Sequence, residues 1–352
     1  MEWRNSGNHE DVSAKVKPFG RAICSALVLA ALMSNAADLR VDLSRNGSNA
    51  VLRWNSQTGE LFSVMRQTTL ATNVSAVAIA SNLQASSGTV TEFTHTNALG
   101  SASGFYRVLR QAFTFDWTGT NFTYTDAERT FTGVMLKPSG AGPFPAVLIQ
   151  HGAGGTVTGY SLAKAREMLQ WGLVCIAPTL THVAGGETNA VNMGFCPENL
   201  ARAAACLNVL ASLPYVDTNR IALFGHSMGA FATIGDASVF SNRVRAVSIS
   251  AGGIIPDSAG ATNAAPTVTE ANHITAPVHM VHCDGDPVVP ASRSQMLADA
   301  LAARGVTHQR IIISSNDIPN NAFWHNLQND ANANTLLLTN TRAWFQTHGV
   351  LP

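Results

Sequence analysis

Near-continuous apolar segments alternate with amphipathic segments from about residue 112 onward, and this constrains the fold more than any other feature of the chain. FPAVLIQ, LVCIAP, RIALFG and APVHMVHC have the length of strands. YSLAKAREMLQWG and ENLARAAACLNVLASLP between them predict helices, and a last helix is expected from about Asn326 to Thr347. Strands that are apolar throughout are typical of a parallel sheet covered by helices. The pattern predicts an α/β domain over residues 112–352, with a hairpin in FTYTDAERTFTGVML.

Residues 38–111 have a different texture, rich in Ser, Thr, Asn, Val and Ala and without a helical period. NAVLRWNSQTGELFSVMRQ alternates around a glycine-containing turn, which predicts a hairpin, and AVAIASNL and GFYRVLRQ predict further strands. We expect a small β-sandwich-like module, which resembles the fibronectin-like modules fused to secreted bacterial enzymes. Contact with a surface or a glycan is one role for it, and a spacer or packing domain is the other.

The N-terminal segment has the layout of a secretory leader. An apolar run of about twelve residues, Ala22 to Met33, follows the basic stretch KVKPFGR and precedes small residues. A bilayer-spanning helix needs about twenty apolar residues, so this run is too short to cross. We expect a signal peptide over residues 1–37, cut after Ala36 or Ala37, with a buried helix as the alternative. The chain is then expected to be a secreted or periplasmic bacterial protein that is not membrane-spanning.

Charge and motif content exclude several function classes. The net charge is zero and only 12% of residues are charged, so the chain lacks the electrostatic footprint of a protein that binds nucleic acid or an anionic membrane. No Cys/His spacing suggests a zinc site, and GAGG is not followed by the Gly-Lys-Ser/Thr of a phosphate loop. We expect no metal and no cofactor.

Four of the five cysteines follow the leader. Cys196 and Cys206 bracket a predicted helix, in which ten residues would hold them about 15 Å apart, too far to bond. Cys175 and Cys283 lie in apolar strand-like runs and are expected to be buried thiols.

The segment LFGHSMGAFAT places Ser227 between two glycines, after a predicted strand and before a predicted helix of small residues. A nucleophile on such a strand-to-helix turn takes a strained backbone conformation, and Gly225 and Gly229 leave room where side chains would clash. The pentapeptide alone also arises by chance in a chain rich in Gly and Ser, so an ordinary turn serine is the alternative. The context favours Ser227 as a nucleophile.

A serine nucleophile needs a base and an acid, which in this fold follow it in the order acid, then histidine. The segment VHCDGDPVVP offers Asp284 and Asp286 after the next strand but one. Here the chain resembles the α/β-hydrolase superfamily, specifically serine-bearing relatives of dienelactone hydrolase, many of which carry His-Gly-x-x-Asp-x-x-Val-Pro. Aligning His282 with that histidine implies Asp286 as the acid, with Asp284 as the fallback. Cys283 replaces the usual glycine.

The base is expected to be His325, in the loop of IIISSNDIPNNAFWHNLQND after the following strand. Its imidazole would take the Ser227 proton and return it to the leaving group, with Asp286 fixing the tautomer. The other histidines fit worse. His308 precedes its strand, His348 closes the last helix, and His279 and His282 are expected to be core histidines of the strand that leads to Asp286.

The segment HGAGG, residues 151–155, follows an earlier strand and is expected to complete an oxyanion hole. A tetrahedral intermediate needs two preorganised donors, each worth about 3–4 kcal/mol. We expect the backbone N–H of Met228 to be one. The resemblance implies Ala153 as the other, whereas a lipase-like loop would use Gly152 or Gly154. A plain glycine turn is the structural alternative.

The resemblance implies a serine carboxylic ester hydrolase. The segment after the strand that follows the elbow, residues 252–275, is polar and lacks the period of an amphipathic lid. We therefore expect an open cleft for short or medium acyl esters or polymer-borne esters. Phe231 and Trp324, with Phe323, are expected either to line it or to lie in the core. Two alternatives stay open, namely a serine peptidase or amidase with the same triad and a non-catalytic binding protein with a relict hydrolase domain.

Overall fold

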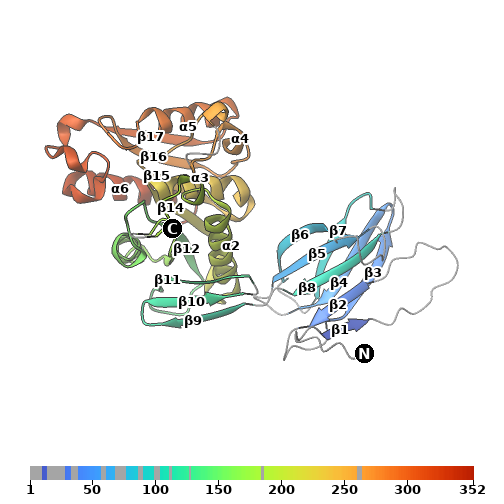
Figure 1. Cartoon of the computed structure of the whole chain (residues 1–352). Helices are drawn as coiled ribbons and strands as arrows, with labels where there is room; N and C mark the ends of the chain where they lie inside the picture. Colours follow the sequence, from blue (N-terminus) through green and yellow to red (C-terminus); the bar gives the residue numbers. More distant parts are fainter. Residues whose placement is uncertain are drawn as a thin grey trace, which may run out of the picture. The chain divides into compact units, whose positions relative to one another are not determined.

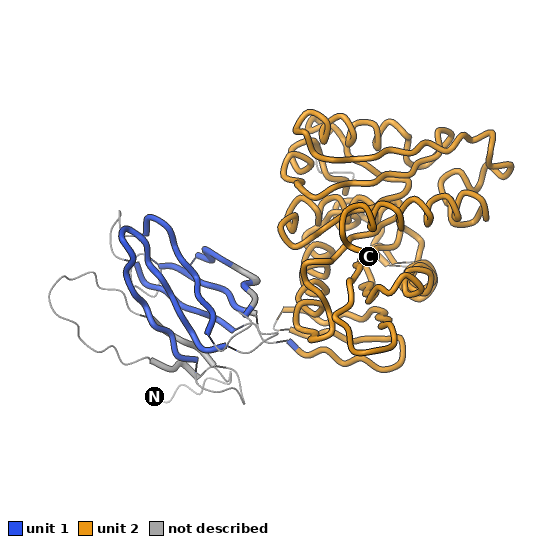
Figure 2. Tube along the Cα trace, turned by 180° about the vertical axis from the view of Figure 1, so that it is seen from behind, with its two compact units in different colours: residues 1–113 blue, residues 114–352 orange. Residues whose placement is uncertain are grey.

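The chain folds into two units, residues 1–113 and residues 114–352, each with its own core, in the computed structural model (Figure 2). The predicted signal peptide over residues 1–37 lies mostly outside the residues that the structure describes, and its cleavage after Ala36 or Ala37 stays a prediction. Its described parts form two short strands. The structure describes residues 10–13, 28–32, 39–56, 61–67, 77–85, 90–98, 104–110, 113–126, 128–183, 186–259 and 264–352.

Two small sheets make up the described part of the first unit (Figure 1). One is antiparallel with the order β3-β4-β7, and the other has the order β1-β2-β8-β5-β6 with a single parallel pair, β2 and β8. The strands are β1 (Glu10–Ser13), β2 (Val28–Leu32), β3 (Val41–Asn46), β4 (Asn49–Asn55), β5 (Leu61–Gln67), β6 (Val77–Gln84), β7 (Val90–His95) and β8 (Phe105–Arg110).

The two small sheets share one apolar core. Leu52 and Trp54 of β4 pack with Phe62 and Val64 of β5, and the rings of Trp54 and Phe62 meet edge to face with centroids 5.3 Å apart. The predicted hairpin of these two strands is wrong, because β4 pairs with β3 and β7 whereas β5 pairs with β6 and β8. Alternation determines which side chains face the core, but it does not determine the partner strand.

A nine-stranded sheet forms the centre of the second unit, in the order β17-β16-β15-β14-β12-β13-β11-β10-β9 (Figure 1). The six strands from β12 to β17 run parallel, and β9 to β11 extend the sheet in antiparallel fashion. The parallel sheet and the hairpin, formed by β10 and β11, are confirmed. The strands are β9 (Thr114–Thr118), β10 (Asn121–Thr125), β11 (Thr130–Leu136), β12 (Phe144–Gln150), β13 (Val174–Pro178), β14 (Val216–His226), β15 (Ala246–Ser250), β16 (Val278–Cys283) and β17 (His308–Ile313).

Helices cover both faces of this sheet. On one face Met168 of α1 and Phe345 of α6 join Ile149 and Phe224 of the strands in one buried cluster. The alternate strand residues, such as Leu148, are equally buried on the opposite face, where α2 and α3 pack. The helices are α1 (Leu162–Leu169), α2 (Pro197–Ser212), α3 (Met228–Val239), α4 (Val268–Ala271), α5 (Ser292–Ala303) and α6 (Ala331–Thr347).

The last helix begins later than expected. Two single 3₁₀ turns precede α6, and Asp330 caps it by accepting hydrogen bonds from two backbone N–H groups of its first turn. The expected start near Asn326 is therefore wrong, and the loop that carries His325 stays outside the helix.

The strand order places a topological switch beside β12. The chain leaves β12 for β13 on one side and then returns to β14 on the other. Ligands of open α/β sheets bind at the carboxyl ends of strands at such a point. Here β12 leads into the HGAGG segment and β14 leads into Ser227.

The described residues contain no helix with the length and apolar character required to cross a membrane. Four cysteines in the described residues are buried free thiols, namely Cys175, Cys196, Cys206 and Cys283. Helix α2 separates Cys196 from Cys206, as expected.

Candidate active site

Ser227 lies on the turn between β14 and α3 with φ 56° and ψ −123°, a region that residues with a Cβ rarely occupy. The glycines on either side are required by space. A Cβ on Gly225 would clash with Thr233 Oγ1, and a Cβ on Gly229 would clash with the backbone carbonyl oxygen of Gln150. The turn therefore packs α3 close against β12 and β14, and it holds the serine hydroxyl at the carboxyl edge of the sheet.

The structure brings together Ser227, His325 and Asp286. His325 Nε2 lies 2.8 Å from Ser227 Oγ, and His325 Nδ1 lies 2.8 and 3.0 Å from the two carboxylate oxygens of Asp286. Because Nδ1 faces only acceptors, it carries the proton, and Nε2 is free to accept the serine proton. All three side chains are buried. This is the tautomer that a general base requires.

Asp286 is surrounded by hydrogen-bond donors. Its Oδ1 accepts from the backbone N–H groups of Val288 and Val289 at 2.8 and 2.9 Å, and its Oδ2 lies 3.2 Å from His282 Nε2. Burial alone would raise the pKa of Asp286, but hydrogen bonds from His282, His325 and the Val289 N–H outweigh it and hold this pKa well below its usual range. Asp286 is therefore ionised at all ordinary pH values.

The fallback acid, Asp284, does not lie beside His325. It is exposed, and its Oδ1 accepts the backbone N–H of Ser315 at 2.7 Å, which fixes the loop after β17.

Two neutral histidines fix the HGAGG segment. His151 Nδ1 donates to the Gly152 carbonyl at 3.0 Å, and its Nε2 accepts the Leu180 N–H at 3.3 Å. His182 Nε2 donates to the His151 carbonyl at 2.9 Å. Burial lowers the pKa of His151, and burial lowers that of His182 to about 4. Both rings are therefore uncharged supports for the loop.

Gly152 lies against Ser227, since a Cβ on it would come within 3.0 Å of Ser227 Cβ. Gly155 N–H closes the turn onto the Gly152 carbonyl at 3.1 Å, and Ala153 between them is exposed. In the described part of the chain, neither the Met228 N–H nor the Ala153 N–H donates to another group. Both are available to an anion, and the choice of Ala153 over Gly152 or Gly154 stays a prediction.

An aromatic wall, absent from the sequence expectations, flanks the triad. The His226 ring stacks on Tyr160 with centroids 5.2 Å apart and lies 5.3 Å from the His325 ring, while its Nδ1 is 3.0 Å from Ser250 Oγ. Burial, followed by repulsion from His325, lowers the pKa of His226 to about 3. His226, which precedes Ser227, is thus a neutral neighbour of His325.

The two predicted pocket aromatics have different surroundings. Phe231 of α3 is buried in a small cluster with Ile255, Ala265 and Val289, against which Met228 packs. Trp324 borders the main core of the unit and donates Nε1–H to the Ile318 carbonyl at 3.0 Å. Contact of either ring with a substrate stays a prediction.

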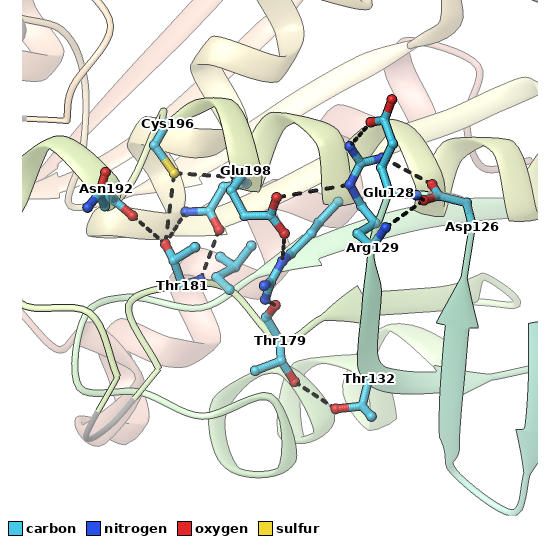
Figure 3. Close-up of polar contacts among 12 residues, drawn as sticks. Asp126, Glu128, Arg129, Thr132, Thr179, Thr181, Asn192, Cys196 and Glu198 are labelled. Carbon is cyan, nitrogen blue, oxygen red and sulfur yellow. Dashed lines mark hydrogen bonds and ion pairs between the residues drawn. The ribbon is translucent and has the colours of Figure 1, made fainter. Parts of the chain in front are cut away.

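A polar network fastens the loop between β13 and α2 (Figure 3). Thr181 Oγ1 donates to the Asn192 carbonyl at 2.6 Å and accepts from Asn199 Nδ2 at 3.0 Å. Further along, Phe195 N–H donates to the Ala264 carbonyl at 2.7 Å. A Cβ on the neighbouring Gly194 would reach Met228 Sδ. This loop therefore covers the side chain of Met228, which follows Ser227.

The remaining histidine expectations agree with their surroundings. His279 is buried, its Nδ1 lies 3.0 Å from Ser248 Oγ, and its ring stacks on Trp344. His308 opens β17 at the opposite edge of the sheet, and His348 ends α6 against Trp344. None of the three is hydrogen-bonded to the triad.

The sequence expectations missed the contact between His282 and Asp286. The four-residue spacing of His282 and Asp286 in HCDGD is compatible with this contact, whereas the apolar run before them is typical of a core strand. No group of His, Cys, Asp or Glu side chains in the described ranges could hold a metal ion.

Comparison with known proteins agrees with the fold of the second unit. The sequence profile of the Dienelactone hydrolase family matches residues 131–349. A solved structure from Klebsiella pneumoniae, provisionally assigned as a dienelactone hydrolase, is similar at 18% identity and a TM-score of 0.52, covering 67% of this chain and 99% of that one. Dipeptidyl peptidase 4 of Porphyromonas gingivalis is similar at 14% identity and a TM-score of 0.51, covering 91% of this chain and 45% of that one. No curated protein sequence gives a match.

Proposed function

The chain belongs to the dienelactone hydrolase family and is a hydrolase, and from this premise we propose that it is a serine carboxylic ester hydrolase. The observation that supports this is the hydrogen-bonded series from Ser227 through His325 to Asp286. A serine hydroxyl is a weak nucleophile, and the imidazole nitrogen 2.8 Å away is placed to activate it.

In the first half of the reaction, Ser227 Oγ attacks the ester carbonyl carbon and His325 Nε2 takes the hydroxyl proton. The tetrahedral intermediate then collapses to an acyl-enzyme as His325 returns the proton to the alcohol. Water attacks the acyl-enzyme in the second half, with His325 again as the base, and the acid and free Ser227 are released. Asp286 stays ionised throughout and stabilises the imidazolium.

The negative oxygen of each tetrahedral intermediate would be bound by the N–H groups of Met228 and Ala153. The Met228 N–H is at the start of α3, where the helix dipole also favours negative charge. Preorganised donors of this kind need no rearrangement when the charge develops, which is why they contribute so much to such reactions.

We propose short or medium acyl esters, or ester groups borne on a polymer, as the substrates. The described parts of the segment over residues 252–275 contain a single α-helical element, the four-residue α4, which is too short for an amphipathic lid. We expect the acyl group to lie against the apolar cluster of Phe231, Ile255 and Val289 beside Met228. We expect no activation at an oil–water interface.

Export and the role of the first unit belong to this proposal. The leader over residues 1–37 would direct the enzyme out of the bacterial cytoplasm, and the β unit would contact a surface or a glycan near the substrate. Edman sequencing of protein recovered from the periplasm or medium should start at Ala37 or Asp38. Recovery of the full-length chain from the cytoplasm alone would contradict export.

The decisive experiment compares the parent and Ser227→Ala on p-nitrophenyl esters from acetate to laurate. The parent should prefer short or medium chains, and kcat of Ser227→Ala should fall about ten-thousandfold or more. A fluorophosphonate probe should label the parent and not the variant. A folded parent that neither turns over these esters nor takes the label would be a binding protein with a relict site.

A peptide anilide run in parallel separates ester from amide hydrolysis, because a peptidase would use the same three residues. The likeness to the Porphyromonas gingivalis peptidase extends to the fold alone at 14% identity. Faster turnover of the anilide than of the butyrate ester would replace the esterase proposal with a peptidase.

A further inference from the structure

A second histidine contacts the carboxylate of the proposed triad. His282 lies at the end of β16, is fully buried, and places its Nε2 2.8 Å from the Val289 carbonyl oxygen and 3.2 Å from Asp286 Oδ2. Both neighbours are acceptors, so Nε2 must carry a proton. The N–H is therefore directed at the backbone of the acid loop and at the carboxylate itself.

The other side of the ring is held as firmly. His282 Nδ1 lies 3.0 Å from Ser294 Oγ of α5, and Arg310 Nε of β17 donates to the same oxygen at 2.9 Å. Arg310 also donates to the Ala291 carbonyl at 3.0 Å. Among the described residues, the charged groups that contact the ring directly or through Ser294 are Asp286 and Arg310, and His325 lies beyond Asp286.

Two N–H donors approach Asp286 Oδ2, one from His325 and one from His282. His325 Nδ1–H at 2.8 Å belongs to the base itself, while His282 Nε2–H belongs to a rigid strand. Without the second donor, the carboxylate would keep its two backbone N–H bonds on Oδ1 but could turn about them. Its negative charge would also be less compensated and would bind the His325 proton more strongly.

From these contacts we infer that His282 is a positioning residue for catalysis, which orients Asp286 and compensates part of its negative charge. This inference rests on the proposed function, in which Asp286 is the acid of the triad. The buried ring of His282 would act through Asp286 and is not one of the three triad residues.

Two substitutions test the contacts of His282 Nδ1 and His282 Nε2 separately. In His282→Asn the side-chain amide can reach Ser294 but is too short for Asp286, so the Nε2–H donor is lost. In His282→Gln the longer amide replaces that donor, and its two hydrogens can serve Val289 and Asp286 together, while the contact with Ser294 is lost. The two variants differ in whether they keep the N–H donor to Asp286, and their side chains are similar in size and polarity.

The experiment measures kcat, KM and the pH profile of p-nitrophenyl butyrate hydrolysis for the full chain, with thermal unfolding of each variant. His282→Asn should lower kcat about tenfold at nearly unchanged KM, and its acid limb should move up by about one pH unit. His282→Gln should recover most of kcat and the parental limb. An unchanged profile in a folded His282→Asn, or equal impairment of both variants, overturns the inference.

Ser294→Ala provides a second route if His282→Asn does not fold. It releases the ring from α5, and the acid limb should move in the same upward direction by a smaller amount; an unchanged limb overturns the inference. Ser227→Ala and Asp286→Asn are run alongside. If both are inactive while His282→Asn is parental, only the positioning role fails, whereas an active Ser227→Ala would remove the proposed function and the positioning role with it.

Discussion

Ser227 shows how backbone geometry and chemistry meet in one residue. Its positive φ is imposed by the close packing of β14 and α3, and this geometry depends on neighbours that lack side chains. Gly152 belongs to the same arrangement, although it comes from a different loop. Its α-carbon faces Ser227 Cβ, so the proposed oxyanion loop and the nucleophile are separated by no more than van der Waals contact.

Gly152→Ala should therefore affect activity more than stability. The new Cβ would lie 3.0 Å from Ser227 Cβ and 3.3 Å from the His226 carbonyl oxygen, so the loop must move away by a few tenths of an ångström. We expect kcat to fall about tenfold or more, because small displacements at a reacting centre are costly. Steady-state kinetics with thermal unfolding tests this.

Gly104→Ala in the first unit is the control for that variant, since its new Cβ would meet only the flexible side chain of Arg66, which can move aside. It should keep the parental kcat. If Gly152→Ala is as active as Gly104→Ala, the loop does not take part in the reaction.

At this scale, the chain order of serine, acid and histidine, together with the family resemblance that selects Asp286 over Asp284, identifies the three residues that the structure brings together. The choice depended on the chain order that this fold imposes and on the strand that precedes each residue. Contacts made sideways between strands and helices could not be obtained in this way. His282 with Ser294 and Tyr160 with His226 depend on packing angles that no local pattern records.

Among the elements, α3 contains a fully buried carboxyl group. Asp236 lies fully buried in it, and within the described residues neither of its carboxyl oxygens has a hydrogen-bond partner of normal geometry. Burial raises the pKa of Asp236 well above its usual value, and a nearby Gln150 offsets only part of the effect. A buried carboxyl of this kind is most stable when it is protonated.

This raised pKa gives α3 a pH-dependent stability. The unfolded carboxyl loses its proton near pH 3.9, whereas the folded one keeps it to higher pH. The contribution of Asp236 is therefore fully present below about pH 4 and decreases as the pH rises toward the folded pKa. Asp236→Asn removes this loss, so its melting temperature should match the parent at pH 4 and exceed it increasingly toward pH 8.

Calorimetry across that pH range measures the effect, and Asp299→Asn on the exposed side of α5 is the control. A gain for Asp236→Asn of more than about 1.4 kcal/mol at pH 8 is expected, since each unit of the raised pKa corresponds to that amount. A difference from the parent that does not change with pH would contradict the burial argument.

Ion pairs of Glu198 help to attach α2 to the start of β11. Glu198 accepts from Arg202 Nε at 2.8 Å and lies 4.0 Å from Arg129 Nε, which links α2 to the start of β11 (Figure 3). All three side chains are partly exposed to solvent, so the pairs contribute little. Glu198→Gln should cost about 0.5–1 kcal/mol in urea unfolding, and the difference should shrink in 1 M NaCl.

The sequence identified most elements of the second unit because each strand is apolar throughout and each helix has a polar face. It failed where a neighbour decides. β4 and β5 alternate as hairpin strands do, yet they lie in different sheets, because the pattern specifies the buried face and not the partner. The start of α6 depends on the cap at Asp330, which overrides the apolar period before it.

For the whole molecule, the second unit has its own sheet, core and triad within residues 114–352. We therefore predict that a fragment of these residues folds and hydrolyses p-nitrophenyl butyrate with kcat/KM within about twofold of the full chain, because a domain with its own core can fold alone. Circular dichroism melts and steady-state kinetics of both proteins provide the measurement.

A shorter fragment, residues 129–352, is the control. It lacks β9 and β10, so Phe131 and the edge of β11 lose their cover, and we expect aggregation. An inactive fragment 114–352 would show that the first unit is needed for the fold of the second.

The four thiols of the second unit have a practical consequence. Each is sheltered from solvent in a different part of the hydrolase unit, on β13, at the start of α2, within α2 and on β16. An alkylating reagent can reach them only when the surrounding region opens, so the mass added to the fragment over time would count opening events in native buffer, thiol by thiol, without any introduced label.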